Sequence, residues 1–210
     1  MAGNVIITGV NNVASLTALQ NSAVNLSDVA AVNAGLLHGS ATLNSSLENR
    51  ASGELRALAG DWVRFEDSGN INAGEINNFG GQIDFAQDMT NESGGFIDGR
   101  GQFVADGGWT NKGLMAFSGT TDILGDVVND VGGQIITLGG TTTTIFDDLE
   151  HNGQEIRIGV GSRTVVFGQA SAAGAYNDVG IVEFVHVFSP GNSPGMVSFG
   201  GDGNYLHHTD

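Results

Sequence analysis

The feature that most constrains this chain is a short phrase that returns about every twenty residues. Each copy holds an apolar residue, an asparagine and a glycine within a few positions, and an alternation of apolar and polar residues follows it. The asparagines lie 23, 19, 20, 18, 23 and 25 residues apart. In chain order they are Asn49, Asn72, Asn91, Asn111, Asn129, Asn152 and Asn177. A turn residue that recurs at one phase of a loose period predicts a chain that coils and stacks on itself.

The alternating runs predict short β-strands. Residues 82–85, 114–117 and 164–167 alternate with period two, and Gly and Asn bound most such runs. The strands are too short and too evenly spaced to have helices between them, which disfavours an α/β fold, and a β-sandwich is the alternative. The fixed phase of Asn and Gly favours an all-β, right-handed parallel β-helix, or β-solenoid, with rungs of about 18–25 residues.

The chemistry of the phrase supports stacked coils. Asparagine tolerates the left-handed backbone region, and glycine enters it without steric cost. Asparagines at one phase of coils spaced roughly 4.8 Å apart can join their amides into a continuous hydrogen-bonded row. We therefore predict that the seven asparagines form a structural ladder along the solenoid.

The charge balance excludes several partners. The chain carries 7 basic and 23 acidic residues, for a net charge of −16, whereas nucleic-acid binding requires neutralisation of phosphates. The same balance disfavours anionic membranes and polyanionic sugars. No stretch reaches the roughly 20 apolar residues of a membrane span, so we expect neither nucleic-acid binding nor membrane insertion. The lack of cysteine fits an exported repeat protein.

Three segments are expected. Residues 1–46 form N-terminal rungs or a helical cap, since Val10, Val13, Leu16 and Leu19 recur every three residues and Ser15 could begin a helix. Residues 47–186 form the β-solenoid repeats, and residues 187–210 form a terminal segment. The start has no secretory signal, so we expect a mature or shortened form of an exported protein. Neither end shows a capping sequence, which suggests stacking of one copy on another.

Aspartates precede the repeat asparagines. We predict that Asp67, Asp88, Asp106, Asp126 and Asp148 stack at one corner of the solenoid. Carboxylates are calcium ligands, so Asp88, Asp106, Asp126 and Asp148 are candidate calcium residues. The favoured alternative is that each carboxylate accepts backbone N–H groups of its own turn, with no cofactor.

The sequence gives little support for catalysis. Asp147 and Asp148 are neighbours, yet adjacent residues of a strand point to opposite faces, so we expect a non-enzymatic protein. Trp62 and Trp109 could stack on sugars, although burial is the favoured interpretation for both.

Residues 69–203 resemble the Gly/Asn-rich repeat region of exported bacterial surface proteins, both autotransporter-like and sorting-signal-anchored, of the planctomycete type. The resemblance rests on the Asn-x-Gly rungs and on the Ser-Pro-Gly-Asn-Ser-Pro-Gly element at residues 189–195. It implies a right-handed β-helix, an extracellular or cell-surface location, a structural or adhesive role, and no catalytic residues. The expected function is a structural module of a surface fibre that associates with itself; the alternative is an adhesin that binds glycans, and a polysaccharide-active enzyme is the least favoured.

Overall fold

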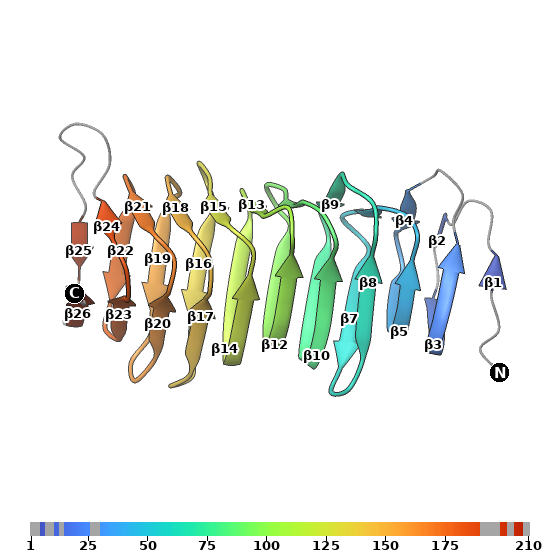
Figure 1. The fold of residues 1–210 in the computed structure, drawn as a ribbon, viewed down its shortest axis with the longest axis horizontal. Coiled ribbons are helices and arrows are strands. Elements are labelled where there is room, and N and C mark those ends of the chain that lie inside the picture. The colour runs from blue at the N-terminus through green and yellow to red at the C-terminus, as the bar shows by residue number, and fades with distance from the viewer. Residues whose placement is uncertain are drawn as a thin grey trace.

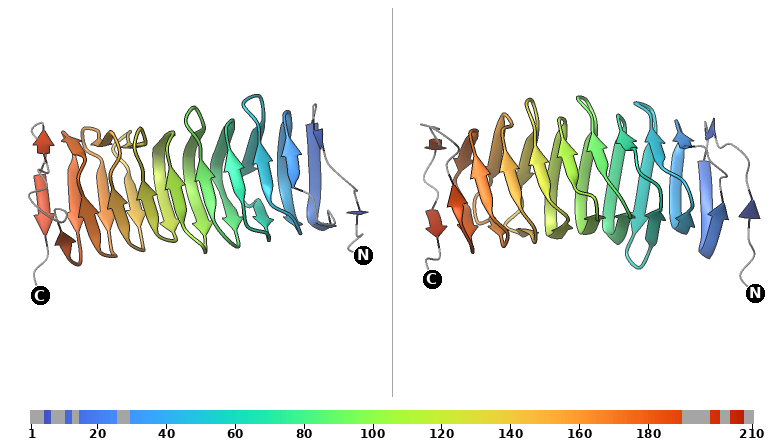
Figure 2. Two further views of the ribbon diagram at one scale, coloured as in Figure 1. Left: turned by 90° about the horizontal axis from the view of Figure 1, so that it is seen from above. Right: turned by 45° about the horizontal axis from the view of Figure 1, so that its top comes forward.

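Parallel strands stack along one long axis in the computed structural model of the chain (Figure 1). The structure describes residues 5–6, 11–12, 15–25, 30–189, 198–200 and 204–207. This described part consists of strands and connecting turns, without a helix. The blue and red strands lie at opposite ends of the stack, and two further views show the same side-by-side arrangement (Figure 2). The prediction of an all-β solenoid is confirmed.

Two sheets run the length of the stack. The short sheet has ten strands in chain order: β2 (Asn11–Asn12), β4 (Ala31–Asn33), β6 (Leu47–Asn49), β9 (Asn70–Asn72), β11 (Met89–Asn91), β13 (Trp109–Asn111), β15 (Val127–Asn129), β18 (Leu149–His151), β21 (Ala170–Ala172) and β24 (Phe188–Ser189).

The long sheet has sixteen strands. They are β1 (Val5–Ile6), β3 (Ser15–Asn25), β5 (Leu36–Leu43), β7 (Glu54–Leu58), β8 (Trp62–Phe65), β10 (Glu75–Phe85), β12 (Phe96–Ala105), β14 (Leu114–Leu124), β16 (Gln134–Thr137), β17 (Thr142–Ile145), β19 (Glu155–Ile158), β20 (Arg163–Val166), β22 (Ala175–Asp178), β23 (Ile181–Phe184), β25 (Ser198–Gly200) and β26 (Asn204–His207). Because Ser15–Asn25 is a strand, the helical cap considered for this segment is wrong.

Each turn of the solenoid passes through both sheets. A short strand leads through a tight turn into one bent strand, such as β12, or into two strands, such as β16 and β17. The register between β10 and β12 shifts between Phe79 and Gln82, where the strand bends. This bend divides the long sheet into a first face, which carries β7, β16 and β19, and a second face, which carries β8, β17 and β20.

The alternation of each strand creates one continuous core. The first and third residues of the short strands point inward, as in β11, where Met89 and Asn91 are buried and Thr90 is partly exposed. Inward residues of both sheets form a single hydrophobic cluster. Phe65 stacks on Phe85, with ring centroids 5.5 Å apart, and Trp109 contacts Phe85 and Phe103 edge-on. The core exists only because turns stack, since one turn cannot cover its own apolar side.

An amide ladder runs inside the corner where the short sheet ends. Each Nδ2 donates to the Oδ1 of the asparagine on the next turn, at 2.7–2.8 Å, from Asn33 to Asn129. The members are Asn33, Asn49, Asn72, Asn91, Asn111 and Asn129. All are buried, and the second N–H of most reaches a main-chain carbonyl, such as that of Gln134 for Asn111. The ladder therefore satisfies polar groups inside the core and fixes the register of the turns.

Two predicted members do not belong to the ladder. Asn152 is exposed and donates to Glu150, because His151 takes the inward position of β18 opposite Asn129. Asn177 is exposed on the long sheet, where it donates to Glu155. A shift of one residue moves a strand side chain to the opposite face, so Asn152 cannot reach the core. Conversely, Asn33 is a ladder member that the repeat phrase did not identify.

The repeat glycines serve two different purposes. Gly94 and Gly132 have φ of 97° and 88°, the left-handed geometry expected of the turn. Gly74, Gly113 and Gly153 instead leave room for neighbours: a Cβ on any of them would lie closer than 3.0 Å to backbone oxygens or ladder amides of an adjacent turn. At these three positions it is the close stacking of turns that excludes a side chain.

His151 ends the ladder as a neutral ring. Its Nδ1 lies 3.0 Å from Asn129 Nδ2, which can only donate, so Nδ1 accepts. Its Nε2 therefore carries the proton and donates to the Ala175 carbonyl at 3.1 Å. Burial lowers the pKa of His151 below its ordinary 6.5, and the bond to Ala175 opposes this shift only in part.

We expect acid to weaken this end of the ladder. Below pH 6.5 the unfolded chain takes up a proton at His151, whereas burial keeps the ring of the folded chain neutral. The neutral ring therefore contributes its full stability above pH 6.5, and this contribution declines as the pH falls toward the lower pKa of the folded chain. His151→Asn, which restores an amide, should show a smaller fall in melting temperature between pH 7 and pH 5.5 than the wild type. The other histidines are common to both proteins. Equal falls in both would contradict this assignment.

Candidate functional site

The predicted calcium aspartates do not form one row. Asp126 and Asp148 directly precede paired strands of the short sheet, but Gly108 holds the equivalent position between Asp88 and Asp126. Asp106 lies two residues before Gly108. Asp67 also falls outside the row, because it precedes β9 by three residues. The prediction that all five side chains stack at one corner is wrong, because Asp67 and Asp106 lie two residues before the position that Asp88, Asp126 and Asp148 share.

Asp88, Asp126 and Asp148 accept main-chain N–H groups of a neighbouring turn, so the expectation that they accept N–H groups of their own turn is wrong for these three. Asp88 accepts the Gly69 N–H at 3.0 Å, and Asp148 accepts the Gln169 N–H at 2.8 Å. Asp126 accepts the N–H of Asp148 at 3.2 Å. Asp126 and Asp148 line a shallow cavity of about 300 Å³ beside Glu150. Among the residues that the structure describes, no three His, Asp or Glu side chains are placed to hold a metal ion.

We expect calcium to leave the stability of this chain unchanged. Asp88, Asp126 and Asp148 already accept hydrogen bonds from main-chain N–H groups, so millimolar calcium and a chelator should give melting temperatures that agree within about 1 °C. Thermal unfolding of the wild type and of Asp148→Asn in both solutions tests this. A calcium-dependent rise that Asp148→Asn abolishes would contradict the expectation.

The two tryptophans have opposite environments. Trp109 is 2% exposed in the core, and its Nε1 donates to the Leu124 carbonyl at 3.0 Å. Trp62 begins β8 and is 43% exposed. The expectation of burial therefore holds for Trp109 and is wrong for Trp62, which presents part of its indole on the second face of the long sheet.

A row of polar side chains continues from Trp62 across successive turns. Strand pairing aligns Trp62 with Gln82, Gln82 with Gln102, and Gln102 with Asp122. We call these four residues the Trp62 row. Each points outward because its neighbours Val63, Ile83, Phe103 and Ile123 are buried. The row places an aromatic ring, two amides and a carboxylate on one flat face.

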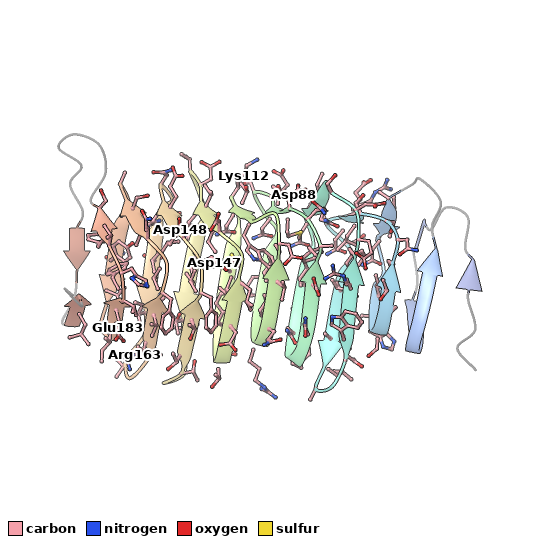
Figure 3. The ribbon with its side chains drawn as sticks, viewed as in Figure 1. Asp88, Lys112, Asp147, Asp148, Arg163 and Glu183 are labelled. Carbon is pink, nitrogen blue, oxygen red and sulfur yellow. The ribbon has the colours of Figure 1, made fainter. Side chains whose placement is uncertain are left out.

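A partly buried ion pair lies against the indole. Asp84 is 4% exposed and accepts both hydrogen bonds of Arg64 Nη1, at 2.7 and 2.8 Å. The same carboxylate lies 3.4 Å from Trp62 Nε1 and from Gln82 Nε2. The hydrogen bonds that Arg64 donates to Glu66 and Asp84 raise the pKa of Arg64, so the guanidinium stays protonated. A second pair on this face, Arg163 with Glu183, joins later turns (Figure 3).

The corner next to the Trp62 row is partly apolar. Leu58 is 50% exposed and Phe79 is 43% exposed, and they are partners on neighbouring strands. Arg100 follows as the next partner of Phe79. A Cβ at Gly119 would meet the carbons of Arg100, so the stem of this arginine lies over Gly119. The corner and the row together form an amphipathic surface suited to binding.

A separate titratable group lies on the first face. Burial raises the pKa of Asp98, and the nearby carboxylates of Glu75 and Glu54 raise it further. Asn77 bridges Glu54 and Glu75 through its Nδ2. The adjacent pair Asp147 and Asp148 (Figure 3) does not act as one site, since Asp147 accepts the Gly125 N–H at 2.7 Å and Asp148 accepts the Gln169 N–H. The Trp62 row is therefore the better candidate, and its chemistry is that of binding.

Sequence reasoning missed most of this surface. Trp62 was recognised as a possible sugar platform, but Gln82 and Gln102 lie about twenty residues apart and carry no motif. What they share is their position in the strand register, since each stands directly before a buried apolar residue of a long-sheet strand.

Comparisons with known proteins identify no relative. No family model matches the chain, and searches of curated proteins and of solved structures likewise gave no match. The described residues include no helix with the length and apolarity that a membrane crossing needs. Residues 190–197, which hold most of the Ser-Pro-Gly-Asn-Ser-Pro-Gly element, lie outside the described part. The chain's function must therefore be inferred from its own geometry.

Proposed function

We propose that this chain is a non-enzymatic, rod-shaped structural module of an exported bacterial surface or extracellular fibre. The observation that carries the proposal is the ladder from Asn33 to His151, which is buried and joins every turn that it crosses. The buried amides are used to hold the stack together. Such an interior gives a stiff rod whose outer faces remain available for contacts.

The stack also supports association between copies. Among the described residues, the first and last strands of the long-sheet path, β1 and β25, each have a neighbour on one side only. Open strand edges pair readily with further strands. The turns already stack in register without special connecting elements, so another copy of the chain would continue the same parallel pairing.

Electron microscopy of the purified chain tests this proposal. Nine spacings of about 4.8 Å between the ten short strands give a rod of about 45 Å. We expect particles several times this length at milligram-per-millilitre concentration, and shorter ones on dilution. Particles that remain about 45 Å long at every concentration would overturn self-association. Surface labelling of intact cells tests export, and label confined to the cytoplasm would overturn it.

The second candidate function is glycan binding by an adhesive surface module. The half-exposed indole of Trp62, aligned with amide and carboxylate side chains, favours it. Aromatic rings with a few placed polar groups are the common lining of sugar and other small-ligand sites. The two functions are compatible, because a rod can carry a binding face.

A further inference from the structure

The Trp62 row defines a class of ligand. We propose that it binds a linear, uncharged polysaccharide that lies across successive turns, along the solenoid axis. The inference rests on the second candidate function, and it adds the ligand class, the orientation and the residues.

The dimensions of the row fit an extended chain. Trp62, Gln82, Gln102 and Asp122 lie on β8, β10, β12 and β14, which are neighbours in the sheet (Figure 1). Three strand spacings of about 4.8 Å give a row of about 14 Å. That length accommodates a few sugar units in a line, whereas a compact ligand would reach only one or two of these side chains.

The chemistry of the row matches hydroxyl-rich rings. The exposed part of the indole offers an apolar face for the C–H side of a sugar ring. The amides of Gln82 and Gln102 can both donate and accept, and the Asp122 carboxylate accepts from hydroxyls. The indole is held before binding by its Nε1 contact to Asp84, so little ordering is needed when the ligand arrives.

The charge of the row disfavours acidic polysaccharides. Arg64 beside the row is already paired with Asp84 and Glu66, so it offers no free cation to a uronate. Asp122 adds a negative charge to the row itself, and the net charge of −16 repels polyanions. An uncharged chain avoids this repulsion.

Calorimetric titration of the full chain with hexasaccharides of β-linked glucose, mannose and xylose tests the proposal, with hexagalacturonate as the acidic control. We expect at least one neutral hexasaccharide to bind and the acidic one to fail. Trp62→Ala should weaken binding by at least about tenfold, and Gln102→Ala by about threefold. Trp62→Phe, which keeps an aromatic ring, should retain most of the affinity.

Because only Trp62 and Trp109 contribute indole fluorescence, saturation with a neutral hexasaccharide should also change the fluorescence emission of the wild type but not that of Trp62→Phe.

Phe146→Ala is the matched control, since Phe146 is also 43% exposed but stacks on Phe167 on later turns. It should bind as the wild type does. If Trp62→Ala binds equally well, glycan binding stands but the row is not its site. If no neutral hexasaccharide binds the wild type, both this inference and the glycan-binding function are overturned, while the test of the fibre by microscopy is unaffected.

Discussion

Asn111→Ala should destabilise the chain by about 3–5 kcal/mol, because it opens the amide ladder in its middle. The wild-type side chain accepts from Asn91 and donates to Asn129 and to the Gln134 carbonyl. Alanine leaves the buried Oδ1 of Asn129 and the Gln134 carbonyl without these donors, and each unsatisfied group costs about 1–3 kcal/mol. Urea unfolding measures the loss. Hydrogen exchange should show faster opening of the turns on both sides of residue 111.

Asn152→Ala is the control for this change, because its side chain is exposed and donates only to Glu150. It should shift stability by less than about 0.5 kcal/mol. Asn177→Ala, on the long sheet, should behave in the same way. Equal destabilisation by Asn111→Ala and Asn152→Ala would contradict the ladder as the source of stability.

Gly133→Ala should strongly destabilise the turn that follows β15. A Cβ there would lie closer than 3.0 Å to the Asn111 carbonyl, the Asn129 Oδ1 and the Asp130 carbonyl. Two of these oxygens belong to the main chain and the third to the ladder, so none can move without breaking hydrogen bonds. We expect a loss of more than about 4 kcal/mol, or failure to fold. Thermal unfolding and the yield of soluble protein are the measurements.

Gly132→Ala provides the adjacent comparison. Gly132 has φ of +88°, and the nearest atom to its Cβ position is the Lys112 carbonyl oxygen at 3.6 Å. The cost is therefore only that of a left-handed alanine, about 1–2 kcal/mol. If Gly132→Ala proves as harmful as Gly133→Ala, backbone conformation rather than close stacking governs the turn.

Periodicity made the fold predictable. Residues that alternate between core and solvent, such as those of β11 and β13, return with the turn asparagine at nearly constant phase, and only stacked coils bury them all. For the start of the chain, the apolar residues that recur every three positions from Val10 to Leu19 left a helical cap open beside N-terminal rungs, and the strand at Ser15–Asn25 agrees with the rungs. Pairing of β3 with β5 in register overrides that local pattern, because backbone groups at 15–25 gain partners from the next turn.

The repeat phrase identified most ladder residues but not the one on β18. The asparagine that stands next to a glycine in this turn is Asn152. In the structure, however, the ladder residue is the third residue of a short strand whose first residue also points inward, as in Val127–Asn129 and Leu149–His151. That rule selects His151. Spacing along the chain alone could not separate the two, because a difference of one residue decides which face a side chain occupies.

The sequence by itself determined that this chain is a stack of parallel turns with an asparagine ladder, because hydrophobic alternation and turn chemistry are local and repeat. Only the tertiary structure decided which aspartates share a corner, that Trp62 lies on the surface while Trp109 is buried, and that Trp62, Gln82, Gln102 and Asp122 form one row. Those relations depend on where the extra residues of each turn fall, since a shift of one residue within a strand moves a side chain to the opposite face.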